Sequence, residues 1–219
     1  REMMAIYRAL DVQSRGLSGE VTITATEGIG TEWLAPELLA FYHQYPEIVL
    51  NIYVANRTID LEQREADIAL RLGRPTEPDL IARRLLDLHF GLYAATSYVQ
   101  GRPAIRSIAD LSEHEAIGLA HEGHTARLGF GTSILPDDSA RVVFATNSAA
   151  AQVSAARAGY GIAVQGNRWA AMYPELTRIL PELTVSTSEL WLVTHEELKH
   201  SARIKALADF LFDRLHTNR

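Results

Sequence analysis

The sequence has no cysteine among its 219 residues, which excludes disulfide bonds and thiolate metal sites within the chain. A lack of cysteine is typical of a reducing compartment, and we expect a cytoplasmic location. No apolar run approaches the roughly 18 residues that cross a bilayer. Residues 1–10 also lack the basic and apolar regions of a secretion signal. We therefore expect no membrane partner.

Lysine is nearly as scarce, because only Lys199 and Lys205 are lysines among the 21 basic residues, and the net charge is −6. A surface that binds duplex DNA normally carries a basic patch that neutralises phosphates. The sequence therefore predicts that this chain does not itself contact DNA. Its length allows one large domain or two lobes of about 100 residues each.

The first 15 residues place Met3, Tyr7 and Leu10 on one helical stripe, and Gly16-Leu17-Ser18-Gly19 then interrupts the pattern. This predicts the end of an amphipathic helix whose beginning precedes Arg1. A frayed helix that belongs to the following domain is the alternative.

The next segment predicts a βαβαβ unit and hence a parallel sheet. Val21, Ile23 and Ala25 alternate with threonines, as in a strand. We expect a turn at Gly28-Ile29-Gly30 and a helix capped by Thr31. This helix has Leu34, Leu38, Phe41 and Tyr42 on one face and ends at Tyr45-Pro46. Strands at 48–54 and 67–72 and a short helix at 59–64 follow.

The second half contains further strand and helix patterns around an irregular region, residues 97–138. Two separate strands are expected at 80–88 and 90–95, and others at 141–145, 162–165 and 190–194. A helix of small residues runs from Asn147 to Ala158. The last helix places Ile204, Leu207, Ala208, Leu211 and Leu215 on one side.

A strand that ends in a small polar residue and is followed by a helix occurs twice, at 26–31 and 145–149. The free N–H groups of a helix N-terminus favour polar or anionic ligands at the carboxyl ends of strands. Two such sites facing one another would form a ligand cleft between lobes.

Six motifs in register resemble the effector-binding domain of LysR-type transcriptional regulators, from Gly19 to Leu215. They are Gly19–Thr26 with Leu34-Ala35-Pro36, Phe41…Tyr45-Pro46, Asp60-Leu61…Glu65–Gly73, Leu92–Tyr98 with Asp110-Leu111…His114, Asn147-Ser148…Ala158–Ala163, and Leu190–His195.

The resemblance implies an α/β, periplasmic-binding-protein-like fold with two Rossmann-like lobes joined by two crossover strands. Lobe I would comprise residues 19–89 and 189–219, and lobe II residues 90–188. Residues 1–18 would be the tail of a linker helix from a winged helix-turn-helix that this chain lacks. The implied function is to bind a small-molecule effector between the lobes of a homodimer or higher homo-oligomer, with DNA bound only through the absent domain. Dimer contacts are expected at 34–45 and 147–157.

The resemblance also indicates effector contacts. In lobe I these are Thr26, Glu27, Gly28, Asn56, Arg57 and Thr58, and in lobe II they are Asn147, Ser148 and Gln165. Hydroxyls and amides suit a mostly dry cleft, and Arg57 could pair with a carboxylate. Two departures from the family matter. Val164-Gln165-Gly166 replaces the usual apolar residue and proline, and Glu27 adds negative charge at a helix N-terminus, which either opposes an anionic effector or contacts a cationic one.

Other chemistries are less well supported. Trp33 stands where a dinucleotide fingerprint needs glycine. His114, and His121 and His124 with their three-residue spacing, fit solvated loop histidines better than a metal site. For Arg71, a structural ion pair or hydrogen bond is favoured over a ligand contact. No G-x-S-x-G elbow occurs. We expect no enzyme activity, cofactor or metal.

Two rival functions use the same fold: a periplasmic solute-binding protein of a transporter, and an enzyme on this scaffold. An upstream reading frame of about 70–90 residues with helix-turn-helix spacing would exclude the transport function.

Overall fold

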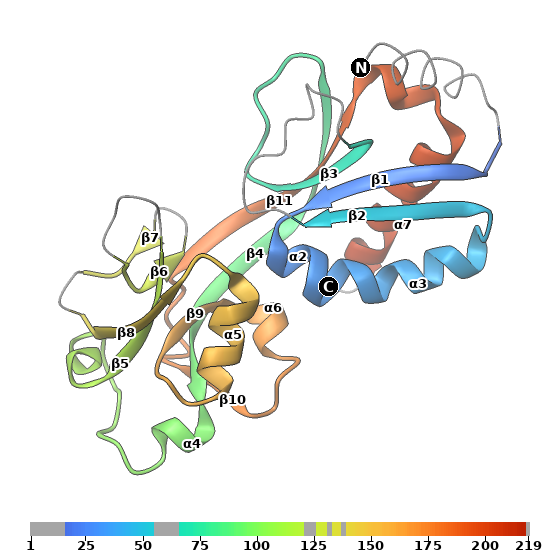
Figure 1. The fold of residues 1–219 in the computed structure, drawn as a ribbon. Helices are drawn as coiled ribbons and strands as arrows, with labels where there is room; N and C mark the ends of the chain where they lie inside the picture. The colour runs from blue at the N-terminus through green and yellow to red at the C-terminus, as the bar shows by residue number, and fades with distance from the viewer. Residues whose placement is uncertain (1–15, 55–65, 121–125, 131–132, 137–138, 218–219) are drawn as a thin grey trace. The chain divides into compact units, whose positions relative to one another are not determined.

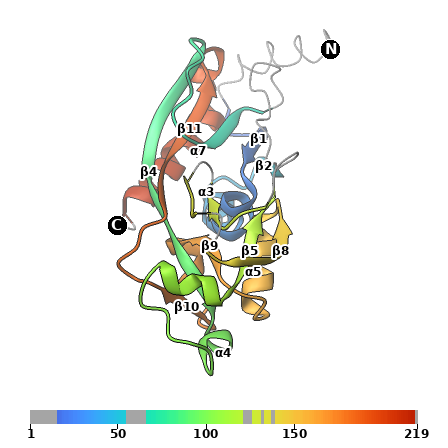
Figure 2. The same ribbon diagram turned by 90° about the vertical axis from the view of Figure 1, so that its left-hand side faces the viewer.

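The computed structural model describes residues 16–54, 66–120, 126–130, 133–136 and 139–217. The chain divides into two compact units. Unit 1 contains the described residues up to Leu86 and those from Glu189 onward, and unit 2 is Asp87–Ser188. The chain passes between the units twice, in β4 (Leu80–Ala95) and in β11 (Ser186–His195), the long strands in Figure 2.

Unit 1 contains the predicted parallel sheet. Strand β1 (Gly19–Ala25) pairs in parallel with β2 (Ile48–Val54) and with β3 (Ile68–Leu72), and β11 then pairs antiparallel with β3. The strand order is β4-β11-β3-β1-β2, so β2 lies at an edge. Val21 and Ile23 of β1 are fully buried, as their alternation with threonines predicts.

The helix after β1 begins earlier than the sequence indicates. Glu27–Ile29 (α2), a π-helical turn Gly30–Leu34 (η1) and Ala35–Gln44 (α3) form one helical run. The expected turn at 28–30 and the Thr31 cap are therefore wrong: Thr31 lies within the helix and its hydroxyl donates to the Glu27 carbonyl at 2.8 Å. Gly30 permits close packing rather than a turn, because a Cβ there would lie 2.7 Å from Cγ2 of Val54.

Helices α3 and α7 (Ala202–Thr217) lie side by side against the sheet of unit 1 (Figure 1). The ring centroids of Phe41 and Phe210 are 5.2 Å apart, and Arg214 forms an ion pair with Glu37. The predicted apolar face of α7 is buried at Ile204, Leu207, Leu211 and Leu215. Tyr42 was placed on the buried face of α3, but it is 50% exposed. A 3₁₀ turn, Glu196–His200 (η3), connects β11 to α7.

In unit 2 the second half of β4 lies between β9 (Ala163–Gly166) and β10 (Leu176–Ile179), both antiparallel to it. The sequence predicted two strands where β4 is one. The predicted break falls at His89, but His89 is an exposed position between buried Leu88 and Phe90, so the strand alternation continues through it. A second sheet pairs β5 (Glu115–Leu119) in parallel with β8 (Arg141–Thr146), and a parallel bridge joins Ala116 to Ile162.

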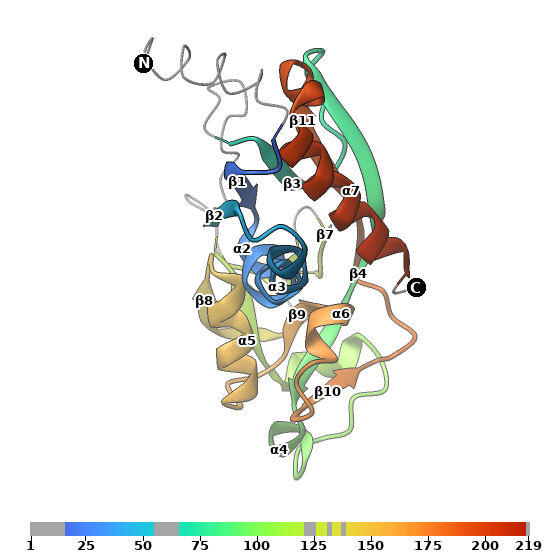
Figure 3. The same ribbon diagram turned by 90° about the vertical axis from the view of Figure 1, so that its right-hand side faces the viewer.

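Helices α5 (Ala149–Arg157) and α6 (Asn167–Ala170) both pack next to β9 (Figure 3). Gly161 lets β9 approach β5 closely, since a Cβ there would lie 2.4 Å from the Glu115 carbonyl oxygen, and its φ is +156°. The remaining elements of unit 2 lie in the segment that the sequence predicts to be irregular. They are α4 (Thr96–Val99), the 3₁₀ turn η2 (Ala109–Glu113), and the short hairpin strands β6 (Gly129–Phe130) and β7 (Ser133–Ile134).

Candidate functional site

Thr26 lies between the carboxyl end of β1 and the first turn of the helical run that follows. It is the N-cap residue, in extended conformation, and its carbonyl accepts the N–H of Gly30 at 2.8 Å. Its hydroxyl, however, makes no capping hydrogen bond. Thr26, Glu27 and Gly28 are all partly exposed. The local structure therefore does not use the Thr26 hydroxyl to cap the helix, and the hydroxyl is placed where a ligand could engage it.

The corresponding position in unit 2 has a different local role. Ser148 is the N-cap of α5, and its hydroxyl oxygen accepts the N–H of Ala151 at 3.1 Å. The Ser148 N–H in turn donates to the hydroxyl of Thr146 at the end of β8. Asn147, between them, is exposed. Ser148 is thus a structural cap, and Asn147 is an exposed residue just after the end of the strand.

Gln165 lies at the carboxyl end of β9 and is 6% exposed. Its side-chain Nε2 has no hydrogen-bond partner among the residues that the structure describes. Because β9, β5 and β8 run in parallel, Gln165 and Asn147 lie towards the same edge of unit 2. A buried amide donor without a partner destabilises the folded state by about 1–3 kcal/mol. A ligand that accepts a hydrogen bond from this N–H would remove that cost.

Gln152 shares this property but was not predicted. It lies on the buried face of α5 beside Val153 and Ala156, and its Nε2 also lacks a partner within the described part of the chain. A glutamine within a run of alanines carries no periodic signal of function. Only its burial identifies it.

A second polar group that the sequence did not reveal lies on one face of the β9-β4-β10 sheet. The register places Gln165 opposite Gly91, and Tyr93 opposite Arg178. The Tyr93 hydroxyl donates to Oδ1 of Asn167 at 3.1 Å. Burial raises the pKa of Tyr93, and the nearby positive charge of Arg178 opposes that shift.

Three predicted contacts of lobe I, Asn56, Arg57 and Thr58, lie outside the described residues, as do the predicted helix at 59–64 and the N-terminal helix. Arg71 has the expected structural role: it donates to the Leu70 carbonyl and, at 3.4 Å, to the hydroxyl of buried Thr24. Burial lowers the pKa of Arg71. Asp67 accepts the N–H of Thr22 at 2.8 Å.

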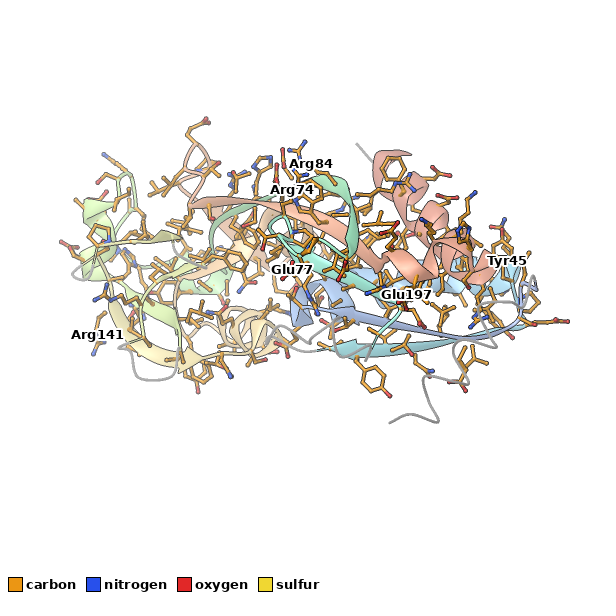
Figure 4. The ribbon with its side chains drawn as sticks, turned by 90° about the horizontal axis from the view of Figure 1, so that it is seen from above. Tyr45, Arg74, Glu77, Arg84, Arg141 and Glu197 are labelled. Carbon is orange, nitrogen blue, oxygen red and sulfur yellow. The ribbon has the colours of Figure 1, made fainter. Side chains whose placement is uncertain are left out.

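His114 is not the solvated histidine that the sequence suggested, because it is 2% exposed, on the loop before β5. Its neighbour Glu115 accepts hydrogen bonds from the hydroxyl of Tyr98 (2.8 Å), from Arg102 (2.6 Å) and from Arg141 (3.0 Å). Arg141 is 73% exposed and projects from the edge of unit 2 (Figure 4). These contacts hold α4, β5 and β8 together, and their role is structural.

A groove of about 340 Å³ lies between the end of α3 and α7, beside Tyr45 in Figure 4. It contains none of the predicted effector contacts that the structure describes. Its lining residues are Gln44, Tyr45, Ala206, Asp209, Phe210, Asp213 and Arg214. Among the described residues no group of three His, Asp or Glu could hold a metal, and no helix is long and apolar enough to cross a membrane.

Two α/β units linked by two strands, with polar residues at strand ends, define a ligand-binding domain of the periplasmic-binding-protein-like class. Residues 14–216 match the LysR substrate binding domain, and the chain belongs to this family. It is the effector-binding regulatory domain of a LysR-type transcriptional regulator and not an enzyme. The resemblance found in the sequence is thus confirmed, and the transporter and enzyme alternatives are excluded.

Related sequences and structures agree with this assignment. An HTH-type transcriptional regulator of Xanthomonas campestris pv. campestris is 27% identical over 224 residues, which are 99% of this chain and 65% of the relative. The activator TtdR of Escherichia coli K12 is 27% identical over 202 residues, covering 88% of this chain and 64% of TtdR. This chain therefore spans less than two thirds of these relatives.

Solved structures show the same fold. The regulatory domain of CrgA, a LysR-type regulator from Neisseria meningitidis, superposes with a TM-score of 0.79 at 24% identity, covering 90% of this chain and 99% of that domain. Full-length AphB of Vibrio cholerae gives a TM-score of 0.77 at 20% identity, covering 97% of this chain and 74% of AphB.

Proposed function

We propose that a small-molecule effector binds at the strand ends of this domain, with Thr26, Glu27 and Gly28 as contacts in unit 1 and Asn147, Ser148 and Gln165 as contacts in unit 2. Asn56, Arg57 and Thr58 complete the proposed set from the family resemblance. The observation that carries the proposal is the side-chain N–H of Gln165, which is buried at a strand end and has no partner in the described part of the chain.

The geometry at Thr26 supports the same site. A threonine hydroxyl at the beginning of a helix usually caps a free N–H group, but that of Thr26 does not. The N–H groups of a first helical turn attract acceptor atoms of a ligand. The Thr26 hydroxyl can add a donor or an acceptor beside them.

We further propose that the whole protein is a cytoplasmic regulator that binds DNA through a winged helix-turn-helix preceding this domain. Effector binding would favour one of two conformations of the domain. The linker helix would transmit that preference to the DNA-binding domain. The scarcity of lysine and the net charge of −6 fit a domain that leaves DNA contacts to another part of the protein.

Side-by-side dimerisation is also part of the proposal. In unit 1 the exposed apolar residues of α3 and the edge strand β2 are Leu39, Tyr42, Val49, Tyr53 and Val54. In unit 2, Val143 on β8 and Tyr160 after α5 are exposed as well. Apolar side chains gathered on an edge strand and an adjacent helix are typical of interaction surfaces.

A thermal-shift screen of this domain against metabolic acids, amines, amino acids and sugars tests the effector site. A ligand at 100 times its Kd adds about 2.7 kcal/mol of stability, which is a shift of several degrees. For a ligand so found, Thr26→Val should weaken binding about 5- to 10-fold, because one hydrogen bond is lost while the shape is kept.

Thr31→Val is the matched control, since the Thr31 hydroxyl is exposed and bonds to its own helix. It should leave affinity unchanged. Equal affinities for the wild type and Thr26→Val would remove Thr26 from the site.

A further inference from the structure

The polar group on the β9-β4-β10 face contains a positive charge that no described residue neutralises. Arg178 of β10 is partly buried, and its buried Nε has no hydrogen-bond partner among the residues whose placement is described. Its one hydrogen bond runs from Nη2 to the Leu183 carbonyl, at 3.4 Å. It forms no ion pair with the residues that the structure describes. Three other arginines of unit 2 have acidic partners: Arg102 and Arg141 bond to Glu115, and Arg157 bonds to Glu175.

The side chain of Arg178 extends over Gly91, the residue next to Gln165. A Cβ built on Gly91 would lie 3.3 Å from Nε of Arg178 and 2.9 Å from Oδ1 of Asn167. The register places Gln165 directly opposite Gly91 on β9. Arg178 of β10 and Asn167 of α6 therefore lie close together over Gly91, and Gln165 lies opposite Gly91 on the neighbouring strand β9.

The chemistry of this group selects one class of ligand. Arg178 and Gln165 both have N–H groups that no described residue accepts, and the nearby side chains of Tyr93 and Asn167 are neutral. A guanidinium that is partly removed from water gains most from a carboxylate, which forms charge-assisted hydrogen bonds with it. A cation would meet repulsion here, and a neutral ligand would leave the charge uncompensated.

We propose that Arg178 is the residue that selects an anionic effector, with Gln165 donating a second hydrogen bond to the same carboxylate. This inference rests on the proposed function, because it extends the effector site from Gln165 across Gly91 to β10.

The test measures binding of short acids and of their neutral amides to the 219-residue chain by calorimetry. The probes are succinate and benzoate, with succinamide and benzamide. Wild type should bind at least one acid and neither amide. Arg178→Gln should weaken binding of that acid about 10- to 100-fold, as expected for loss of a charged hydrogen bond. Arg178→Lys keeps the charge but not the planar guanidinium, so it should lose less affinity for the acid than Arg178→Gln.

Arg106→Gln is the control, because Arg106 is an exposed arginine of the same unit and its removal changes the net charge equally. It should bind the acid as wild type does, and thermal unfolding of each variant establishes that it is folded. Equal binding by wild type and Arg178→Gln overturns the inference, as does a failure of both acids to bind.

Failure of this inference can be separated from failure of the proposed function. If the wider screen yields an amine or sugar whose binding depends on Thr26, the effector site stands and the anion preference is wrong. If no compound of any class binds, both the proposed effector site and the anion preference are contradicted.

Discussion

Tyr98 is a single residue whose contacts link three segments of unit 2. Its hydroxyl donates to the Glu115 carboxylate at 2.8 Å and accepts the Glu115 backbone N–H at 2.9 Å, and Arg102 lies over its ring. Burial, followed by the hydrogen bond to Glu115, raises the pKa of Tyr98 to about 12. That same hydrogen bond is the main reason why the pKa of Glu115 lies below its usual value.

Tyr98→Phe should destabilise the domain by about 1–3 kcal/mol, because it leaves the partly buried Glu115 N–H without its acceptor. Chemical denaturation measures this loss. Tyr160→Phe is the matched control, since Tyr160 is exposed and should be neutral. A Tyr98→Phe variant as stable as wild type would show that water replaces the hydroxyl.

The two pKa shifts also predict how stability depends on pH. An unfolded tyrosine ionises near pH 10, whereas folded Tyr98 does so near 12, so its contribution is lost as pH rises from about 10 to 12. The depressed pKa of Glu115 contributes stability above about pH 4.3, and this is lost as pH falls through the lower folded value. Tyr98→Phe should flatten the alkaline limb of the Tm profile, and Glu115→Gln the acidic limb. Unchanged limbs would contradict these assignments.

At the scale of elements, the connection from α5 to β9 depends on two glycines with different constraints. Gly159 has a φ of +83° but open space around it, whereas Gly161 has a φ of +156° and backbone of β5 against it. The segment was recognisable in the sequence from its Gly159-Tyr160-Gly161 pattern, but the pattern does not distinguish a glycine needed for its φ from one needed for close approach.

Gly161→Ala should therefore be far more damaging than Gly159→Ala. The first forces a Cβ to within 2.4 Å of the Glu115 carbonyl oxygen, so β9 must separate from β5. We expect a loss of more than about 3 kcal/mol, against about 1 kcal/mol for Gly159→Ala, which suffers only an unfavourable φ. Urea denaturation compares the two variants. Similar losses would mean that the β5–β9 contact yields easily.

At the scale of the whole molecule, the proposed dimer surface on α3 and β2 makes a direct prediction. Replacing Leu39 and Tyr42 together by aspartate should give a folded monomer, because charges would be buried where apolar contacts are expected. Size-exclusion chromatography with light scattering measures the mass. Met172→Asp, at an exposed apolar residue of unit 2 that is not among the proposed dimer contacts, should leave the dimer intact. A monomeric wild-type domain at high concentration would contradict dimerisation of this domain.

The sequence by itself determined the class, the family and most elements, because local alternation and helical periodicity report which face of each segment is buried. Val21 and Ile23, or Leu207 and Leu211, are buried as their spacing indicates. Thr26, Asn147 and Gln165 could be proposed as contacts because they follow or end recognisable strands, and their roles in binding stay predictions.

Only the tertiary structure decided features that depend on residues far apart in the chain. It continued β4 through His89, where the two predicted strands were separate, because β11 pairs with β4 and because β9 and β10 pair with its second half. In the structure Gly30 packs closely against Val54, and His114 is buried although its segment has the sequence pattern of a loop. It also brought Arg178 over Gly91 from a strand 87 positions later. Local propensity carries no information about such contacts, because the packing energy that fixes them arises only when the strands meet.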